Sequence, residues 1–159
     1  MRSAQILMAV TAIAAAIQLV PYGRNHGNPI VVQEPPWDHP DTRALAVQAC
    51  FDCHSNETVW PWYASIAPVS WLVQHDVDEG RSVLNLSEWD RIQEEAAESS
   101  ETVREGEMPM ATYTWLHPTA RLDPGERERL ARGLERTMGD EQAQLEAEWL
   151  RGTDATERP

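Results

Sequence analysis

The chain has 159 residues and a formal net charge of −13 at pH 7, from 26 acidic residues against 13 Lys and Arg. This length suits one domain with some accessory sequence. Because so acidic a chain has little with which to neutralise phosphates, its composition argues against nucleic-acid binding and is compatible with docking onto a basic protein partner.

The first 22 residues predict an N-terminal membrane anchor or signal segment. A short positive start with Arg2 precedes a stretch from Ala4 to Val20 that is almost wholly apolar. This stretch is near the lower limit of a membrane-spanning helix and long for a signal-peptide core. We expect an uncleaved anchor rather than cleavage near the small residues 14–16, with Arg2 in the cytoplasm and the remainder outside. Both versions export the domain.

Residues 23–40 predict a Pro/Gly-rich linker, and residues 41–138 predict the folded domain. Proline, glycine and asparagine in the linker are typical of an extended tether between membrane and domain. Asp41 or Thr42 is expected to cap the first helix of the domain, which runs to Cys50.

Cys50-Phe51-Asp52-Cys53-His54 is the attachment signature of c-type haem. Each thiol adds across one haem vinyl group, and a two-residue spacer on a helical turn lets both sulfurs reach the same edge of the porphyrin. His54 follows directly and is expected to give an imidazole nitrogen to the iron as the proximal ligand. The pentapeptide therefore predicts one covalently attached haem.

Three other interpretations of the two cysteines stay open. A zinc site would have to recruit scattered histidines such as His75 or His117, because the chain has no second cysteine pair. A thioredoxin-like redox pair normally lies in a βαβ context, and no such strand pattern is visible. A disulfide between neighbours so close in sequence would close only a tiny loop and stabilise little.

The sequence from Trp60 to Tyr63 predicts an irregular aromatic loop, because Pro61 between two tryptophans prevents regular structure. The chain has seven tryptophans and one phenylalanine, and large aromatics suit a small protein that must cover a flat apolar ring. We expect Trp60, Trp62 and Tyr63 to pack on the haem face or edge. The alternative is ordinary core packing away from the haem.

A helix is expected to begin at Pro68 and to end at Gly80. His75 on this helix is a further candidate axial ligand, although a hydrogen-bonded or exposed histidine is commoner. Arg81 and Asn85 follow the helix. Either side chain is within expected reach of a haem propionate, Arg81 through a charge-assisted hydrogen bond.

Ser87 is expected to cap a longer helix that carries Val103 on its apolar face and stops at Gly106. The methionine that follows, Met108, directly precedes a proline and is therefore biased toward an extended backbone. Such a loop can hold a thioether at the open position of the iron. Met108 is the predicted distal ligand, and Met110, a histidine or an open site are the alternatives.

The last predicted helix begins with a capping box formed by Asp123 and Glu126 around a proline. Its apolar stripe is expected to be buried and contains Leu130, Leu134 and Met138. Residues 139–159 form an acidic C-terminal tail, in which Leu145 and Trp149 lie one turn apart. This spacing is enough for a short helix or a partner contact, and the residues after Gly152 are expected to be disordered.

Over roughly residues 17–138, the run of motifs resembles the bacterial haem-binding domain family of small, amino-terminally anchored, c-type cytochrome-like proteins. The shared motifs are CxxCH with Ser-Asn, Trp-Pro-Trp-Tyr, Pro-Val-Ser-Trp, Gly-Arg, Asn-Leu-Ser-Glu-Trp, Gly-x-Met-Pro and His-Pro. The resemblance implies that Cys50 and Cys53 attach haem, that His54 is the proximal ligand, and that Met108 is the distal ligand.

The sequence as a whole predicts an all-α fold, a small helical cytochrome c-like domain around one covalent haem, preceded by an N-terminal membrane helix. The predicted function is a membrane-tethered monohaem cytochrome that carries electrons in the bacterial periplasm between redox partner proteins, and not an enzyme. A haem-based sensor and a peroxidase-like haem enzyme are the alternatives, and both require a displaceable distal ligand.

Overall fold

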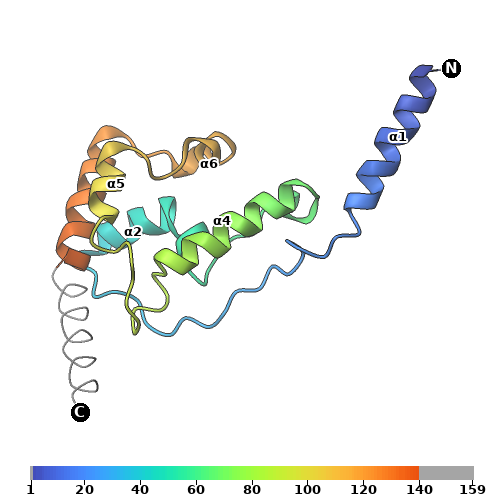
Figure 1. The fold of residues 1–159 in the computed structure, drawn as a ribbon. Helices are drawn as coiled ribbons and strands as arrows, with labels where there is room; N and C mark the ends of the chain where they lie inside the picture. Colours follow the sequence, from blue (N-terminus) through green and yellow to red (C-terminus); the bar gives the residue numbers. More distant parts are fainter. Residues whose placement is uncertain (1, 140–159) are drawn as a thin grey trace, which may run out of the picture.

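The computed structural model describes residues 2–139, and this part of the chain is mostly helical (Figure 1). Its elements are α1 (Arg2–Ile17), α2 (Pro40–Ala49), α3 (Phe51–His54), η1 (Trp62–Ser65), α4 (Val69–Val83), α5 (Ser99–Glu105), α6 (Ala111–Leu116) and η2 (Pro118–Ala120). A further helix covers residues 124–139. The described residues form no strand, only an isolated bridge between Gln33 and Glu88. The all-α prediction is therefore confirmed.

The predictions for the C-terminal tail, with its short helix at Leu145 and Trp149, lie from residue 140 onward outside the described residues.

The N-terminal helix α1 does not support the expected membrane-spanning segment. Among the described residues, no helix is both long enough and apolar enough to cross a membrane. The helix ends at Ile17, so at 1.5 Å per residue it is roughly 24 Å long, against about 30 Å of bilayer hydrocarbon. The next residue, Gln18, bonds to the domain through its side chain, and Pro21, which has no N–H to extend a helix, follows three residues later.

The segment from residue 18 to residue 37, which we call the strap, is extended but held along the domain rather than free (Figure 1). At its start, the amide of Gln18 donates to the carbonyl of Ala67 at 2.8 Å and accepts from the Ala67 N–H at 3.0 Å. Near its end, Gln33 N–H donates to Ser87 O and Gln33 O accepts from Trp89 N–H. The predicted linker is therefore tied to the domain by hydrogen bonds near both of its ends, although most of its residues are exposed.

The apolar core lies where α2, α5 and helix 124–139 meet. Leu45 and Ala46 of α2 are buried against it, together with Val103 of α5. The predicted stripe of the last helix is confirmed, since its three members are at most 3 % exposed: Leu130, Leu134 and Met138. Trp89 is also fully buried, so at least one tryptophan serves the core itself.

The predicted long helix from Ser87 to Val103 is wrong in its first half. Residues 84–98 form turns, and only α5 is helical. Here buried polar side chains bind the main chain. Ser87 Oγ accepts from Asn56 N–H at 2.9 Å, and Gln93 Oε1 accepts from Asn85 N–H at 2.7 Å. Such bonds compete with helical hydrogen bonds, and in this segment they stabilise turns instead of a helix.

The predicted caps of the first and last helices of the domain have different outcomes. The capping box is confirmed, since Glu126 N–H donates to Asp123 Oδ1 at 2.8 Å and Asp123 N–H donates to Glu126 Oε2 at 2.9 Å. At α2 the predicted cap is wrong. The cap is His39, whose Nδ1 accepts from Asp41 N–H, whereas Thr42 lies inside the helix.

Candidate functional site

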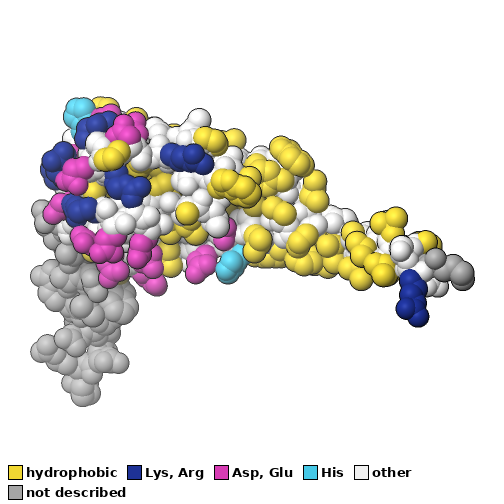
Figure 2. Space-filling view, turned by 90° about the horizontal axis from the view of Figure 1, so that it is seen from above, with side chains coloured by type: hydrophobic (Ala, Val, Ile, Leu, Met, Phe, Trp, Pro, Cys, Tyr) yellow, Lys and Arg dark blue, Asp and Glu magenta, His cyan; other side chains and the backbone are white. Residues whose placement is uncertain are grey.

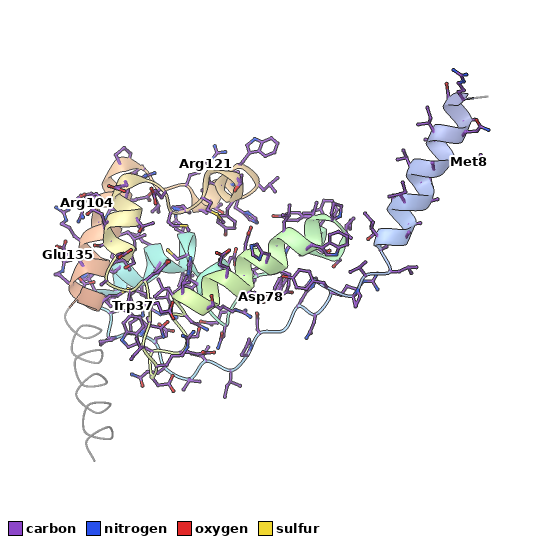
Figure 3. All side chains as sticks on the ribbon, in the orientation of Figure 1. Met8, Trp37, Asp78, Arg104, Arg121 and Glu135 are labelled. Carbon is purple, nitrogen blue, oxygen red and sulfur yellow. The ribbon has the colours of Figure 1, made fainter. Side chains whose placement is uncertain are left out.

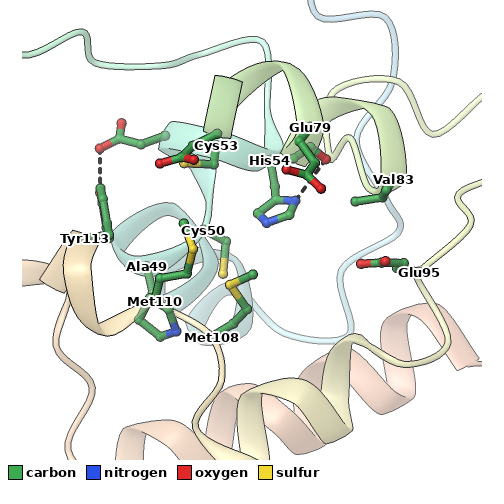
Figure 4. Close-up of a pocket in the computed structure, with 14 residues that line it drawn as sticks. Ala49, Cys50, Cys53, His54, Glu79, Val83, Glu95, Met108, Met110 and Tyr113 are labelled. Atoms are coloured by element: carbon green, nitrogen blue, oxygen red, sulfur yellow. Dashed lines mark hydrogen bonds between the residues drawn. The ribbon is translucent and has the colours of Figure 1, made fainter. Parts of the chain in front are cut away.

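Cys50, Cys53 and His54 line one cavity of about 250 Å³ at the junction of α2, α3 and α4 (Figure 4). The two-residue spacing places both sulfurs on this cavity, as the signature predicts. Met108 and Met110 line it from the loop after α5. A second hollow of about 60 Å³ adjoins it and shares Cys50, His54 and Met108. The structure thus brings the cysteine motif and the predicted distal loop together.

The imidazole of His54 is oriented by the main chain of α4. Its Nδ1 lies 3.1 Å from the carbonyl oxygens of both Gly80 and Leu84. An Nδ1–H donated to these carbonyls leaves the lone pair of Nε2 free, and the ring points into the cavity in Figure 4. Burial lowers the pKa of His54, although the Leu84 and Gly80 carbonyls oppose this shift. The side chain therefore faces the cavity as a neutral imidazole, the form that binds iron.

Gly80 allows α4 to approach the cysteine motif closely. It lies inside α4, which continues to Val83, so the prediction that Gly80 ends the helix is wrong. A Cβ atom on Gly80 would lie 2.6 Å from the carbonyl oxygen of Cys53. Only glycine fits without a shift of α3 or α4. This glycine thus serves the position of His54 rather than helix termination.

The two thiols are free and partly buried, which bears on the alternative interpretations. Burial raises the pKa of Cys50 to about 12 and that of Cys53 to about 12, with the neighbouring Cys53 adding to the effect at Cys50. Thiol–disulfide catalysis and zinc binding both need thiolates, which a lowered pKa favours. In addition, no cluster of three or more His, Cys, Asp or Glu in the described part of the chain is arranged to hold a metal ion. These observations favour neither zinc nor a thioredoxin-like pair.

The histidines proposed as zinc ligands or as an axial ligand point elsewhere. His75 pairs with Glu79 at 3.2 Å on the surface. His117 Nε2 accepts a hydrogen bond from the Tyr63 hydroxyl at 3.1 Å, and the His117 ring stacks on Tyr113. Neither histidine lines the cavity.

The distal loop is set by the end of α5. Gly106 caps this helix in the left-handed region at φ 82°, which favours glycine, so the predicted stop is confirmed. Glu107 N–H and Met108 N–H then both donate to Thr102 O. Met108 packs against the apolar core and lines both hollows, whereas Met110 lines only the larger one. Met108 is therefore the better placed of the two thioethers.

The structure does not bring the predicted aromatic residues Trp60 and Tyr63 to the cavity lining. The Trp60 ring stacks on His26 of the strap at 4.8 Å, and its indole N–H donates to Asn28. The Tyr63 hydroxyl is held by His117. These rings have partners in the strap and near α6, which the local sequence does not reveal.

Arg81 is also absent from the cavity lining. Its Nε donates to the carbonyl of Ser55 at 2.8 Å, and its Nη2 donates to Thr58 Oγ1 at 2.9 Å and to Asn28 Oδ1 at 3.0 Å. The guanidinium thus joins the loop after α3 to the strap. The predicted contact with a propionate would require these bonds to break.

Four carboxylates missed at the level of sequence line the cavity instead: Asp52, Asp76, Glu79 and Glu95. Burial raises the pKa of Asp76. The hydroxyl of Tyr113, which also lines the cavity, donates to Asp52 Oδ2 at 2.6 Å. The described lining contains no Lys or Arg. One signal was available, because Asp52 lies between the two cysteines and so had to lie near the site.

These donors fit a covalently bound haem. Two protonated thiols face the same space as an imidazole whose Nδ1 is held by carbonyls, and a thioether lies on the loop across that space. Cys50 and Cys53 would hold the porphyrin, and His54 and Met108 would bind the iron.

The comparison with known families agrees with this donor set. No curated protein and no solved structure matches the chain. The model of the haem-binding domain family matches residues 12–136, which cover most of the chain and the whole cavity. The chain therefore belongs to the haem-binding domain family.

Proposed function

We propose that the chain binds one haem c covalently through Cys50 and Cys53, with His54 as the proximal and Met108 as the distal iron ligand. The observation that supports this most strongly is the orientation of His54. Its Nδ1 faces the Gly80 and Leu84 carbonyls at 3.1 Å, so Nε2 is directed at the cavity shared by both thiols and Met108. When bound, the haem supplies one-electron redox chemistry.

We propose further that the protein is a monohaem cytochrome that carries electrons between redox partner proteins. Ligands on both faces keep iron low-spin in both oxidation states, so little rearrangement accompanies electron transfer. The chain contributes rigidity on the proximal side, where main-chain carbonyls fix the imidazole. It also contributes negative charge around the cavity, which stabilises the ferric state and opposes the rise in potential that a methionine ligand brings.

The proposed location is the bacterial periplasm, because covalent haem attachment requires export. The apolar helix α1 is proposed to associate with the inner membrane. What supports this is its surface: α1 has no buried residue, and large side chains such as Ile6, Leu7 and Ile13 are more than 60 % exposed. Fractionation of cells that express the full chain tests this part of the proposal.

Carbon monoxide binding by the ferrous holoprotein tests the electron-carrier role. A closed carrier should bind the gas only slowly or at acidic pH and should cycle reversibly between oxidation states. Rapid binding at neutral pH would contradict the carrier role and favour the sensor or the enzyme. Peroxide turnover would then separate these two.

A further inference from the structure

Large apolar side chains gather at one end of the folded domain. Trp62 is 77 % exposed and Trp115 is 76 % exposed, which is unusual for tryptophan. Together with their exposed neighbours in sequence they form what we call the apolar end: Trp62, Ile66, Val69, Leu72, Trp115 and Leu116. Figure 2 shows hydrophobic side chains spread over the half of the molecule nearest α1.

Hydrogen bonds hold the segments of the apolar end next to each other and next to α1. Tyr63 of η1 contacts His117, the residue after α6, at 3.1 Å. Gln18, the residue after α1, bonds twice to Ala67 in the loop between η1 and α4. At Gly23 (φ 74°) the strap passes so close to Ser70 that a Cβ atom would collide with its carbonyl. The end of α1 and the apolar end are therefore one surface rather than two.

Charged pairs gather at the opposite end. Arg104 of α5 pairs with Glu101 and Glu135, and Arg136 pairs with Asp38 at 2.6 Å. Figure 3 shows Arg104 and Glu135 together at this end, far from Met8 of α1, and Figure 2 shows acidic and basic side chains concentrated there. The described part of the molecule is thus polarised along its length, with one charged end and one apolar end.

We propose that the apolar end lies on the surface of a lipid bilayer, beside α1. The occupant is lipid rather than a protein groove, because exposed apolar side chains of α1 are not confined to one face of the helix. A protein groove covers one face of an amphipathic helix, whereas hydrocarbon covers all faces. Tryptophan is enriched in membrane proteins at the boundary between the hydrocarbon and the headgroups of the bilayer. With a net charge of −13, the chain suits uncharged or zwitterionic headgroups.

This placement, which rests on the proposed membrane association of α1 but not on haem, would set the orientation of the cavity. Helix α6 carries Tyr113 in the cavity lining and Trp115 on the apolar end. The haem cavity is then one short helix away from the bilayer. Electron exchange would take place with partners at the membrane surface.

Hydrogen exchange of the full-length holoprotein, with and without phosphatidylcholine vesicles, tests the inference. We expect slower exchange on vesicles at residues 62–66 and 111–117 and unchanged exchange in α5. A double variant, Trp62→Ser with Trp115→Ser, should lose this protection and bind vesicles about tenfold more weakly. The matched control, Ile30→Ser with Val47→Ser, replaces exposed apolar side chains outside the apolar end and should behave as wild type.

The outcomes separate the two proposals. If the protein binds vesicles but residues 62–66 and 111–117 stay unprotected, the apolar end does not face lipid. Membrane association through α1 would then stand, and the apolar end would be a candidate contact surface for a protein partner. A chain that does not bind vesicles at all would overturn both. An unchanged haem spectrum in each variant shows that the domain remains folded.

Discussion

The two walls of the cavity are built in different ways. On the proximal side, His54 is fixed by two carbonyls of α4, and α4 is pressed against the cysteine motif at Gly80. On the distal side, Met108 lies on a loop whose main chain is tied to α5 through Thr102 O. The proposed proximal ligand is thus held by several contacts, whereas the proposed distal ligand depends on a short loop. Substitutions in the two walls should therefore have effects of different size and kind.

The largest effect is expected from Gly80→Ala. The added methyl group would meet the Cys53 carbonyl and force α3 and α4 apart, which should cost about 2–3 kcal/mol of unfolding free energy and reduce the yield of haem-loaded protein. Chemical denaturation and the ratio of haem to protein measure this. Gly139→Ala is the control, because a Cβ atom there meets nothing within 4 Å. Equal behaviour of the two variants would contradict the close packing of α4 on α3.

A smaller effect, confined to the distal wall, is expected from Gly106→Ala. An alanine in the left-handed conformation at φ 82° costs about 1 kcal/mol and must also displace the Arg127 side chain. The loop that carries Met108 should shift, so the absorption bands sensitive to the distal ligand should change while haem attachment persists. A variant that loses covalent haem altogether would show that the two walls are not independent.

Removing one carboxylate from the cavity should change the redox potential rather than stability. Glu95 lines both hollows, and its charge is one of the contributions that oppose the lowering of the His54 pKa by burial. Glu95→Gln should raise the potential by an amount on the order of tens of millivolts, because the ferric haem loses a nearby negative charge. Glu94→Gln, at an exposed position outside the lining, is the control. If redox titration gives both variants the potential of the wild type, the charge of Glu95 does not influence the haem potential.

The smallest effect concerns the strap where it meets α2. Arg43 donates to both oxygens of Glu34 at 2.7 Å, and these bonds hold the pKa of Glu34 below its usual value. Because the folded pKa is depressed, this stabilisation is complete above the unfolded pKa near 4.5 and is lost as pH falls through the folded value. For this partly exposed pair we expect less than about 1 kcal/mol.

Unfolding of wild type and Glu34→Gln between pH 7 and pH 3 measures this contribution. The variant should be less stable at pH 7, and the difference should shrink toward pH 3. A difference that stays constant with pH would assign the loss to packing rather than to the ion pair.

Features that depend on neighbours in sequence could be predicted. The spacing of Cys50 and Cys53, the capping box at Asp123 and the stop at Gly106 are all local patterns, and the structure places each as expected. The partners of the missed residues are distant in sequence. Trp60 meets His26 of the strap, and Arg81 meets Asn28. The hydrophobic periodicity of a sequence does not predict contacts between residues so far apart.

The predicted helix between Ser87 and Ala96 is wrong for the same physical reason. Its apolar spacing is compatible with a helix, but Asn56 and Asn85 bring a buried hydrogen-bond network that fixes turns instead. The wrong prediction at Gly80 has a related cause. A glycine near an expected helix end resembles a stop signal, and only the packing of α3 shows that it is a point of close approach.

Covalent attachment and distal ligation can be tested together by visible spectra of the exported wild-type, Met108→Ala and Met110→Ala holoproteins, recorded before and after acid extraction. We expect a c-type haem that survives extraction in all three proteins, low-spin in the wild type and in Met110→Ala but high-spin in Met108→Ala. Haem that is extracted by acid would contradict covalent attachment at Cys50 and Cys53. A low-spin spectrum in Met108→Ala would contradict the role of Met108 as the distal ligand.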